Sequence, residues 1–301
     1  MKKLFIWDGN NLFRRMESVK AFARMSYNGM ATGSIHGTVK AVLNDIQTFK
    51  PDECVIVFDG AGAAEQKRKV YHGYKANRSG MESQMYQRMA ATSDILRAAG
   101  ICVLQKDGVD ADDAIGALIK KMKNRSVLLR SNDKDFLSQV GPSCRQIRNR
   151  GNGDELWTPE TVWKKYGVKP KQIPDYLALC GDGADGIPGL KNCGPVAAQK
   201  FLKDYGNLKA LISDRATLPT VWRKRVKEQR DELMNFLQLT TLDISVISDS
   251  AIQNIITRLT PSRYADNLFD LCNQYGLKSN REWFSAHNPT VLSGARGLWS
   301  K

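Results

Sequence analysis

Apolar runs that end in an aspartate recur through the first half of the sequence. Three runs share this pattern: LFIWDG to Asp8, CVIVFDG to Asp59, and SVLLRSNDKD to Asp133 and Asp135. Helical patterns lie between them, at about residues 36–49, 83–99 and 112–123. Strands that alternate with helices predict an α/β fold with a mainly parallel central sheet flanked by helices. Ligands bind beyond the carboxyl ends of such strands, so we expect these acids to gather along that edge.

A fourth run, GICVLQKDG, leads into the stretch GVDADDAIGALI at residues 108–119. Here Asp110, Asp112 and Asp113 occupy three of the four positions before an apolar stretch. A helix that begins there needs one acidic cap or two, and three carboxylates repel one another. Asp182 and Asp185 add two more acids in the glycine-rich segment CGDGADG.

The negative charge of these nine aspartates needs a partner. The chain carries 45 Lys and Arg against 31 Asp and Glu, a net charge of +14, but only Lys106 and Lys134 stand among these acids. Hard divalent cations suit all-oxygen sites, which predicts Mg²⁺ with Mn²⁺ as a substitute. The alternative for any single acid is a helix cap, which is worth ~0.3–1 kcal/mol, and Asp113 fits that alternative best.

The acids have no histidine near them in sequence, since the three histidines are His36, His72 and His287. The sequence also lacks a GxSxG elbow and a GxxxxGK[ST] phosphate loop. Two metal ions ~4 Å apart can generate hydroxide and stabilise both the attacking and the leaving oxygen of a phosphoryl displacement. A strongly basic chain favours a polyanion, nucleic acid before an anionic membrane surface. The combination predicts a nuclease.

The compartment is predicted from the cysteines and from the apolar runs. The six cysteines are far apart and form no CxxC pair, which favours a reduced cytoplasmic protein without a zinc site. No apolar run reaches the ~18 residues of a membrane span, and the first one breaks at Asp8, too early for a signal peptide. We therefore expect a cytoplasmic protein.

Residues 60–82 form a basic segment with two tyrosines, which is typical of a mobile loop or arch. After about residue 157 the pattern becomes helical, with Thr158 as the expected N-cap and Pro159 at the first helical position. We expect an α/β catalytic domain at residues 1–156 and a helical region at 157–285. Residues 286–301 have no clear period and are expected to be a poorly ordered tail.

Six segments occur in an order that resembles the flap endonuclease, or 5′ nuclease, family. They are WDGNNLFRR, VFDG, YKANR, DADD, SNDKDF and GDGADGIPGLKNCGP, within about residues 3–240. The chain looks most like the bacteriophage and bacterial members, including the nuclease domain of bacterial DNA polymerase I. The resemblance implies a PIN-like fold with a helical arch at about 60–82 and a helix–hairpin–helix-type motif at about 186–204. It also implies structure-specific cleavage of DNA near 5′ ends, flaps, forks and nicks, in replication or repair, leaving 5′-phosphate and 3′-hydroxyl ends.

The family uses two metal ions, and its motifs assign residues to each by position. The first site would consist of Asp8, Asp59, Asp110 and Asp112. The second would consist of Asp133, Asp135 and Asp182, with Asp112 bridging and with Asp113 and Asp185 in support through water. Arg15 and Lys75 resemble the basic residues that bind the scissile phosphate, with Tyr74 and Arg78 beside them in the arch.

The segment GLKNCGP resembles the hairpin that approaches DNA phosphates, which makes Gly189, Lys191, Cys193 and Gly194 candidates. The family often holds K⁺ at this turn. Three departures from the family pattern are Asp110 in place of Glu, Gly186 in place of Asn, and Asn192 in place of the middle glycine of the hairpin. The last of these bears on the K⁺ site more than on catalysis.

Two other functions fit parts of the sequence. A PIN-type ribonuclease shares the acidic sheet edge but lacks the arch and the hairpin. A catalytically inactive junction-binding protein would keep the fold and lose key acids, and only the Asp110 position departs. No polymerase module follows, so we expect a free-standing nuclease, as in many phages, that acts in bacterial cytoplasm, or in host cytoplasm if it is phage-encoded. We also expect a monomer that does not bind membranes. The sequence leaves open whether RNA–DNA hybrids are substrates and whether a polymerase or helicase recruits the protein.

Overall fold

The computed structural model describes residues 1–63, 65–76, 83–149, 151 and 153–287. The chain divides into two compact units. The first, here called the sheet unit, comprises Met1–Ala61, Met81–Asn132 and Ile244–Lys301. The second, here called the helical unit, comprises Gly62–Gly80 and Asp133–Asp243.

The sheet unit contains four parallel strands in the order β5-β4-β1-β6. Their bounds are β1 Lys2–Asp8, β4 Glu53–Asp59, β5 Cys102–Lys106 and β6 Arg125–Arg130. In β1, Leu4 through Trp7 have no exposed surface, as expected of a strand covered on both faces. These are the four runs that the sequence predicted as strands, and the mainly parallel sheet is confirmed.

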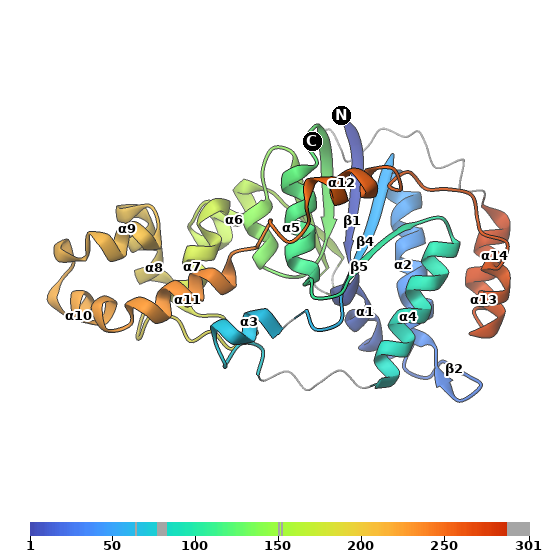
Figure 1. Cartoon of the computed structure of the whole chain (residues 1–301), viewed down its shortest axis with the longest axis horizontal. Helices are drawn as coiled ribbons and strands as arrows, with labels where there is room; N and C mark the ends of the chain where they lie inside the picture. Colours follow the sequence, from blue (N-terminus) through green and yellow to red (C-terminus); the bar gives the residue numbers. More distant parts are fainter. Residues whose placement is uncertain (64, 77–82, 150, 152, 288–301) are drawn as a thin grey trace. The chain divides into compact units, whose positions relative to one another are not determined.

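Helices cover both faces of this sheet. They are α1 Gly9–Glu17, α2 Gly33–Phe49, α4 Ser83–Ala98 and α5 Ala111–Lys121, with the short β2–β3 hairpin, Ser26–Tyr27 and Met30–Ala31, before α2. In Figure 1, α2 and α4 lie together on one side of the strands and α5 lies on the other. Right-handed crossovers require this, because the path from β1 to β4 to β5 runs one way and the path from β5 to β6 runs back.

The register brings the strand ends to one edge. Asp8 is the last residue of β1 and pairs with Val57 of β4, and Asp59 follows two residues later. The strand β6 ends at Arg130, so that Asp133 and Asp135 lie beyond the strand. Asp135 begins the 3-10 helix η1, Asp135–Gln139.

The segment after residue 243 returns to the sheet unit. It contains α12 Asp249–Ile256, α13 Leu268–Gln274 and α14 Lys278–Ala286. Backbone hydrogen bonds that fix it include those from Cys54 N–H to the Leu259 carbonyl (2.8 Å), from Ser262 N–H to the Gly100 carbonyl (3.0 Å) and from Ala265 N–H to the Ala98 carbonyl (2.8 Å). The compact units therefore divide the chain differently from the expected domains at 1–156 and 157–285, which stay a prediction.

The helical unit contains the antiparallel β7–β8 hairpin and a set of short helices. Their bounds are α3 Glu65–Val70, β7 Cys144–Asn149, β8 Asp154–Trp157, α6 Pro159–Tyr166, η2 Pro170–Gln172, α7 Ile173–Cys180, α8 Pro195–Tyr205, α9 Leu208–Ser213, η3 Arg215–Thr217, α10 Thr220–Glu228 and α11 Arg230–Thr240. The predicted start of α6 is confirmed, because Thr158 forms a capping box and Pro159 follows it. Leu177, Leu211 and Phe236 belong to the apolar core that joins these helices.

Two sequence-based predictions concern residues outside this description. The proposed arch at 60–82 contains α3, but residues 64 and 77–82 lie outside the described residues. Most of the expected tail, 288–301, lies outside them as well. Within the described ranges, no helix combines the length and the apolar character needed to cross a membrane.

Candidate active site

Asp8 and Asp59 lie at the carboxyl edge of the sheet unit, held by hydrogen bonds. Asp8 is buried and caps α1, accepting from the Asn11 amide (3.0 Å) and from the Ser131 hydroxyl (2.6 Å). The Asn10 side chain donates to Asp59 and accepts from the Asp59 amide (3.0 Å). The GNN sequence after β1 therefore orients both acids.

The start of α5 approaches the same edge. Its first amide, at Ala111, donates to the Asp59 carboxylate (2.9 Å), which brings the Asp110–Asp113 segment beside the end of β4. Asp110 caps the helix by accepting from the Asp112 amide (3.0 Å). Asp113 is buried and Asp112 is half-buried. The structure thus brings the predicted first group of acids to one edge.

A second group of four acids lies in the helical unit. Asp135, Asp182 and Asp185 are buried, and Asp133 accepts a hydrogen bond from the Asp135 amide (3.0 Å). Asp182 accepts from the Ala184 amide (3.0 Å) and forms an ion pair with Lys134 (2.7 Å). Lys134, singled out by its position among the acids, therefore supplies part of the counter-charge.

Asp135 is the least satisfied member of this second group. Burial raises its pKa well above the usual value, and the negative charges of Asp133, Asp185 and Asp182 raise it further, while Lys75 lowers it. Its buried Oδ1 atom has no hydrogen-bond partner. A buried carboxylate oxygen without a partner, among other carboxylates, provides the hard oxygen ligands that a divalent cation prefers.

The kind of donor atom in the two acidic groups suits a divalent metal ion, whereas their arrangement, in the part of the chain that the structure describes, does not form a metal site. Among the described residues, no group of three or more His, Cys, Asp or Glu side chains is arranged so that it could hold a metal ion. The all-oxygen donor set and the orphaned Asp135 oxygen fit Mg²⁺ or Mn²⁺ better than a soft metal.

Lys75 is buried beside the second group. Its ammonium lies 5.0 Å from the centre of the Tyr74 ring, and its charge acts on Asp135. Its backbone is left-handed, with φ +52°, a conformation that costs a non-glycine residue about 1–2 kcal/mol. Tyr74 is 1% exposed and packs in the apolar core, so its burial supports a structural role more than a DNA contact.

The predicted hairpin residues have mixed surroundings. Gly189 is buried, and a side chain there would meet the Gly181 amide nitrogen at 2.4 Å, so this glycine permits close packing within the protein. Burial raises the pKa of the Cys193 thiol to about 12, and the side chain is covered. Lys191 and Gly194 are exposed, and Gly194 precedes α8, whose first turn has no side-chain cap. Those two positions are open to an anion.

Comparison with known proteins decides the family. Residues 3–167 match the family model for the 5′-3′ exonuclease N-terminal resolvase-like domain, and residues 168–262 match that for the 5′-3′ exonuclease C-terminal SAM fold. The chain belongs to the 5′-3′ exonuclease family. The resemblance drawn from the six motifs is therefore confirmed.

Relatives and solved structures agree with this family. The chain is 34% identical to a 5′-3′ exonuclease of Aquifex aeolicus over 82% of this chain and 85% of the relative. It is 30% identical to DNA polymerase I of Caldicellulosiruptor bescii over 85% of this chain, but spans only 31% of that polymerase. The fold matches the bacteriophage T5 flap endonuclease, solved as a pseudo-enzyme-product complex with DNA and metal ions, with a TM-score of 0.66 at 16% identity, over 93% of this chain and 100% of that one.

Two basic residues were also predicted from the sequence to bind phosphate or DNA, and three polar neighbours of the acids were not predicted. Arg15 is half-buried in the last turn of α1, and Arg78 lies outside the described residues. Sequence reasoning did not assign Asn10, Asn11 or Ser131, although all three stand within two or three residues of a strand end that carries a predicted acid. Polar residues next to such an acid were the available signal.

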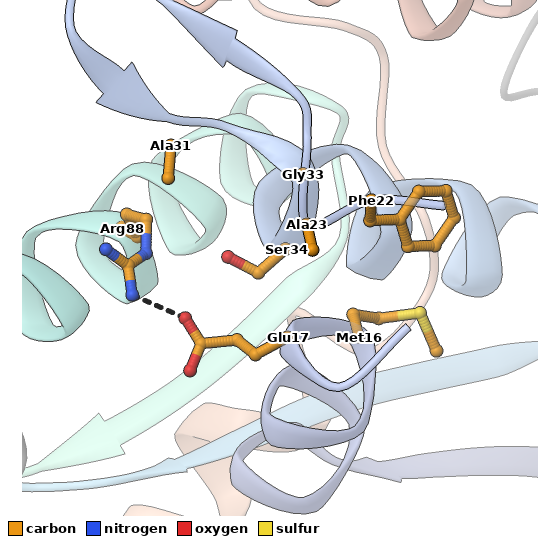
Figure 2. A pocket seen from close by; sticks show the side chains of 8 residues that line it. All are labelled: Met16, Glu17, Phe22, Ala23, Ala31, Gly33, Ser34 and Arg88. Atoms are coloured by element: carbon orange, nitrogen blue, oxygen red, sulfur yellow. Dashed lines mark hydrogen bonds and ion pairs between the residues drawn. The ribbon is translucent and has the colours of Figure 1, made fainter. Parts of the chain in front are cut away.

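The sheet unit also has a cavity of about 300 Å³ between α1, α2 and α4 (Figure 2). The Arg88–Glu17 ion pair lies on one side of it, and Phe22 and Met16 lie on the other. Its described lining contains no member of either acidic group.

Proposed function

We propose that this member of the 5′-3′ exonuclease family hydrolyses DNA phosphodiester bonds near 5′ ends, both as a 5′-3′ exonuclease and as a flap endonuclease. The matching T5 flap endonuclease was solved with DNA and metal ions, which supports DNA as the substrate and a metal requirement. The observation that carries the proposal is the orphaned, buried Asp135 oxygen among Asp133, Asp182 and Asp185, with Lys75 beside it.

The residues that would hold two divalent ions follow from the two acidic groups. Asp8, Asp59, Asp110 and Asp112 would serve one ion, and Asp133, Asp135 and Asp182 the other, with Asp112 shared and with Asp113 and Asp185 acting through water. Such ions would supply positive charge against the phosphate oxygens and lower the pKa of nearby water. A K⁺ ion at the hairpin near Asn192 is part of the proposal.

The chain's own side chains have three tasks in this proposal. Lys75 and Arg15 bind the scissile phosphate and offset its developing charge. Asn10 and the Ala111 amide donate hydrogen bonds to Asp59 and so orient this proposed metal ligand. The exposed Lys191 and Gly194, with Arg78 of the arch, bind the DNA backbone through charge and through the open first turn of α8.

The test is cleavage of a 5′-labelled flap duplex and of a nicked duplex, with Mg²⁺ and with EDTA. We expect 5′-phosphate and 3′-hydroxyl products with Mg²⁺ and none with EDTA. The Asp133→Asn, Asp135→Asn double variant should lose cleavage and bind the flap as well as or better than the wild type, because the basic surface remains. Equal digestion in excess EDTA would refute the metal requirement, and a preference for single-stranded RNA would favour a ribonuclease.

We also propose a further substrate and a protein partner. An RNA–DNA hybrid is included as a substrate in the proposal, and a replicative polymerase or helicase is proposed as the recruiting partner. The match to DNA polymerase I supports the link to a polymerase. Cleavage of a flap whose 5′ segment is RNA, with and without an added polymerase, measures both.

A further inference from the structure

The loop that carries Lys75 is bound to the loop that carries Asp185. The Lys75 amide donates to the Asp185 backbone carbonyl at 2.9 Å, and both residues belong to the helical unit. The next residue, Gly186, also contacts the loop that carries Lys75, here called the lysine loop. A side chain built at Gly186 would lie 2.4 Å from the Gly73 carbonyl oxygen and 3.8 Å from the Lys75 amide nitrogen. The two backbones therefore meet with no room for a side chain between them.

Gly186 is suited to this contact in two ways. Its φ is +71°, a conformation that residues with a side chain rarely adopt. Its missing Cβ leaves the space that the Gly73 carbonyl occupies. Gly183 lies three residues earlier in the same loop and differs in both respects, because its φ is not positive and a Cβ there would meet nothing within 4 Å.

The lysine loop requires a stabilising contact, because the backbone of Lys75 is in the left-handed conformation at φ +52°. Non-glycine residues keep this conformation only where their surroundings enforce it. On one side, the buried Tyr74 ring anchors the loop in the apolar core, and the Tyr74 amide donates to the Tyr71 carbonyl (3.0 Å). On the other side, the contact with Asp185 and Gly186 completes the constraint.

We infer that Gly186 is a positioning residue. Because it lacks a side chain, the loop that carries Asp185 can dock on the lysine loop, and this contact holds the Lys75 ammonium beside Asp135. The inference rests on the phosphate-binding role proposed for Lys75. It makes the two loops one rigid element, in which Gly186 acts on the reaction through Lys75.

A double-mutant cycle tests the inference. Single-turnover cleavage of the 5′-flap duplex is measured in Mg²⁺ for the wild type, Gly186→Ala, Lys75→Ala and the double variant, with Gly183→Ala as the matched control. We expect Gly186→Ala to lower the rate by about 10–100-fold, because small displacements of a catalytic group have effects of that size. Flap binding should change little, and in the Lys75→Ala background the second substitution should lower the rate by less than about twofold.

Hydrogen exchange of the Lys75 amide gives a readout that needs no substitution. This amide should be protected in the folded wild type, remain protected in Gly183→Ala and lose protection in Gly186→Ala. An unprotected amide in the wild type would show that the loops are not docked. This measurement remains decisive even if Gly186→Ala folds poorly.

The kinetic outcomes separate the inference from the proposed function. Equal slowing by Gly186→Ala in both backgrounds, or no slowing at all while Lys75→Ala is slow, would overturn the inference and leave the role of Lys75 intact. A Lys75→Ala variant that cleaves at the wild-type rate would overturn both. A wild type that does not cleave the flap would refute the proposed function itself.

Discussion

Substituting Asp135 by Asn should stabilise the metal-free protein while abolishing cleavage. The Asp135 carboxylate is buried, its Oδ1 atom has no partner, and three neighbouring carboxylates raise its pKa after burial itself. Asn has nearly the same shape and carries no charge, so it removes both the repulsion and the cost of a buried charge. The carboxamide can also donate to a neighbouring carboxylate, and a hydrogen bond to a charged group contributes about 1.5–3 kcal/mol, so we expect a gain of about 1–3 kcal/mol in EDTA.

The assay is thermal unfolding in EDTA and in Mg²⁺. A gain of about 1 kcal/mol corresponds to a rise in Tm of about 2–4 °C for a protein of this size class. Mg²⁺ should raise the Tm of the wild type, because a ligand that binds only the folded state stabilises it, and should raise that of the variant much less. Asp214→Asn is the matched control, since Asp214 is an exposed aspartate of the same unit. It should shift stability by no more than about 0.5 kcal/mol.

One result would refute this reasoning. If Asp135→Asn lowered the Tm in EDTA as much as in Mg²⁺, the carboxylate would be a stabilising member of the fold. The proposal that it awaits a cation would then lose its main support, whether or not the variant cleaved DNA.

Three further predictions concern other parts of the chain. Asn10→Ala should lower cleavage and raise the Mg²⁺ requirement by about 10–100-fold, because it removes one of the groups that orient the Asp59 carboxylate. Asn44→Ala, at an exposed site on α2, should match the wild type in the same titration. Burial alone would raise the pKa of Glu53, but hydrogen bonds from Arg125 and Lys2 outweigh it and lower the pKa below 4.5. The stabilisation is therefore present above about pH 4.5 and is lost as the pH falls through the folded-state value. Glu53→Gln should cost about 1.5–3 kcal/mol at pH 7 in urea unfolding, and the difference from the wild type should shrink in acid; an equal difference at every pH would contradict the ion pairing. Flap binding in EDTA should weaken steeply with rising NaCl, and a flat salt dependence would show that phosphate contacts contribute little.

The sheet and one acidic group could be predicted because their signals are local. Each strand is an apolar run that ends in an acid, and parallel pairing then brings Asp8 and Asp59 to one edge whatever the connecting helices do. The cap of α6 at Thr158 was equally local. The return of residues 244–287 to the sheet unit was not, since it depends on backbone pairs such as Ser262 with Gly100, which no periodicity encodes.

Residue type alone does not show how the residues proposed to contact DNA are packed. A tyrosine in a basic segment suggested an exposed contact at Tyr74, whereas the ring is 1% exposed in the apolar core. A glycine in a hairpin suggested close approach of phosphate at Gly189, whereas the space beside it is filled by the Gly181 backbone. In both cases the sequence shows a side chain's chemistry, and only the tertiary packing shows which surface it faces.

The two acidic groups also differ in how their charge is satisfied. In the sheet unit, Asp8 and Asp59 accept hydrogen bonds from neutral donors that include Asn10 and Ser131, and these bonds orient both carboxylates. In the helical unit, four acids face Lys134 and Lys75, and Asp135 still has an oxygen without a partner. In the helical unit, the charge of Lys75 acts on Asp135, so the position of Lys75 has an electrostatic consequence there. A backbone contact as small as that between Gly186 and Gly73 is therefore expected to affect the reaction through Lys75.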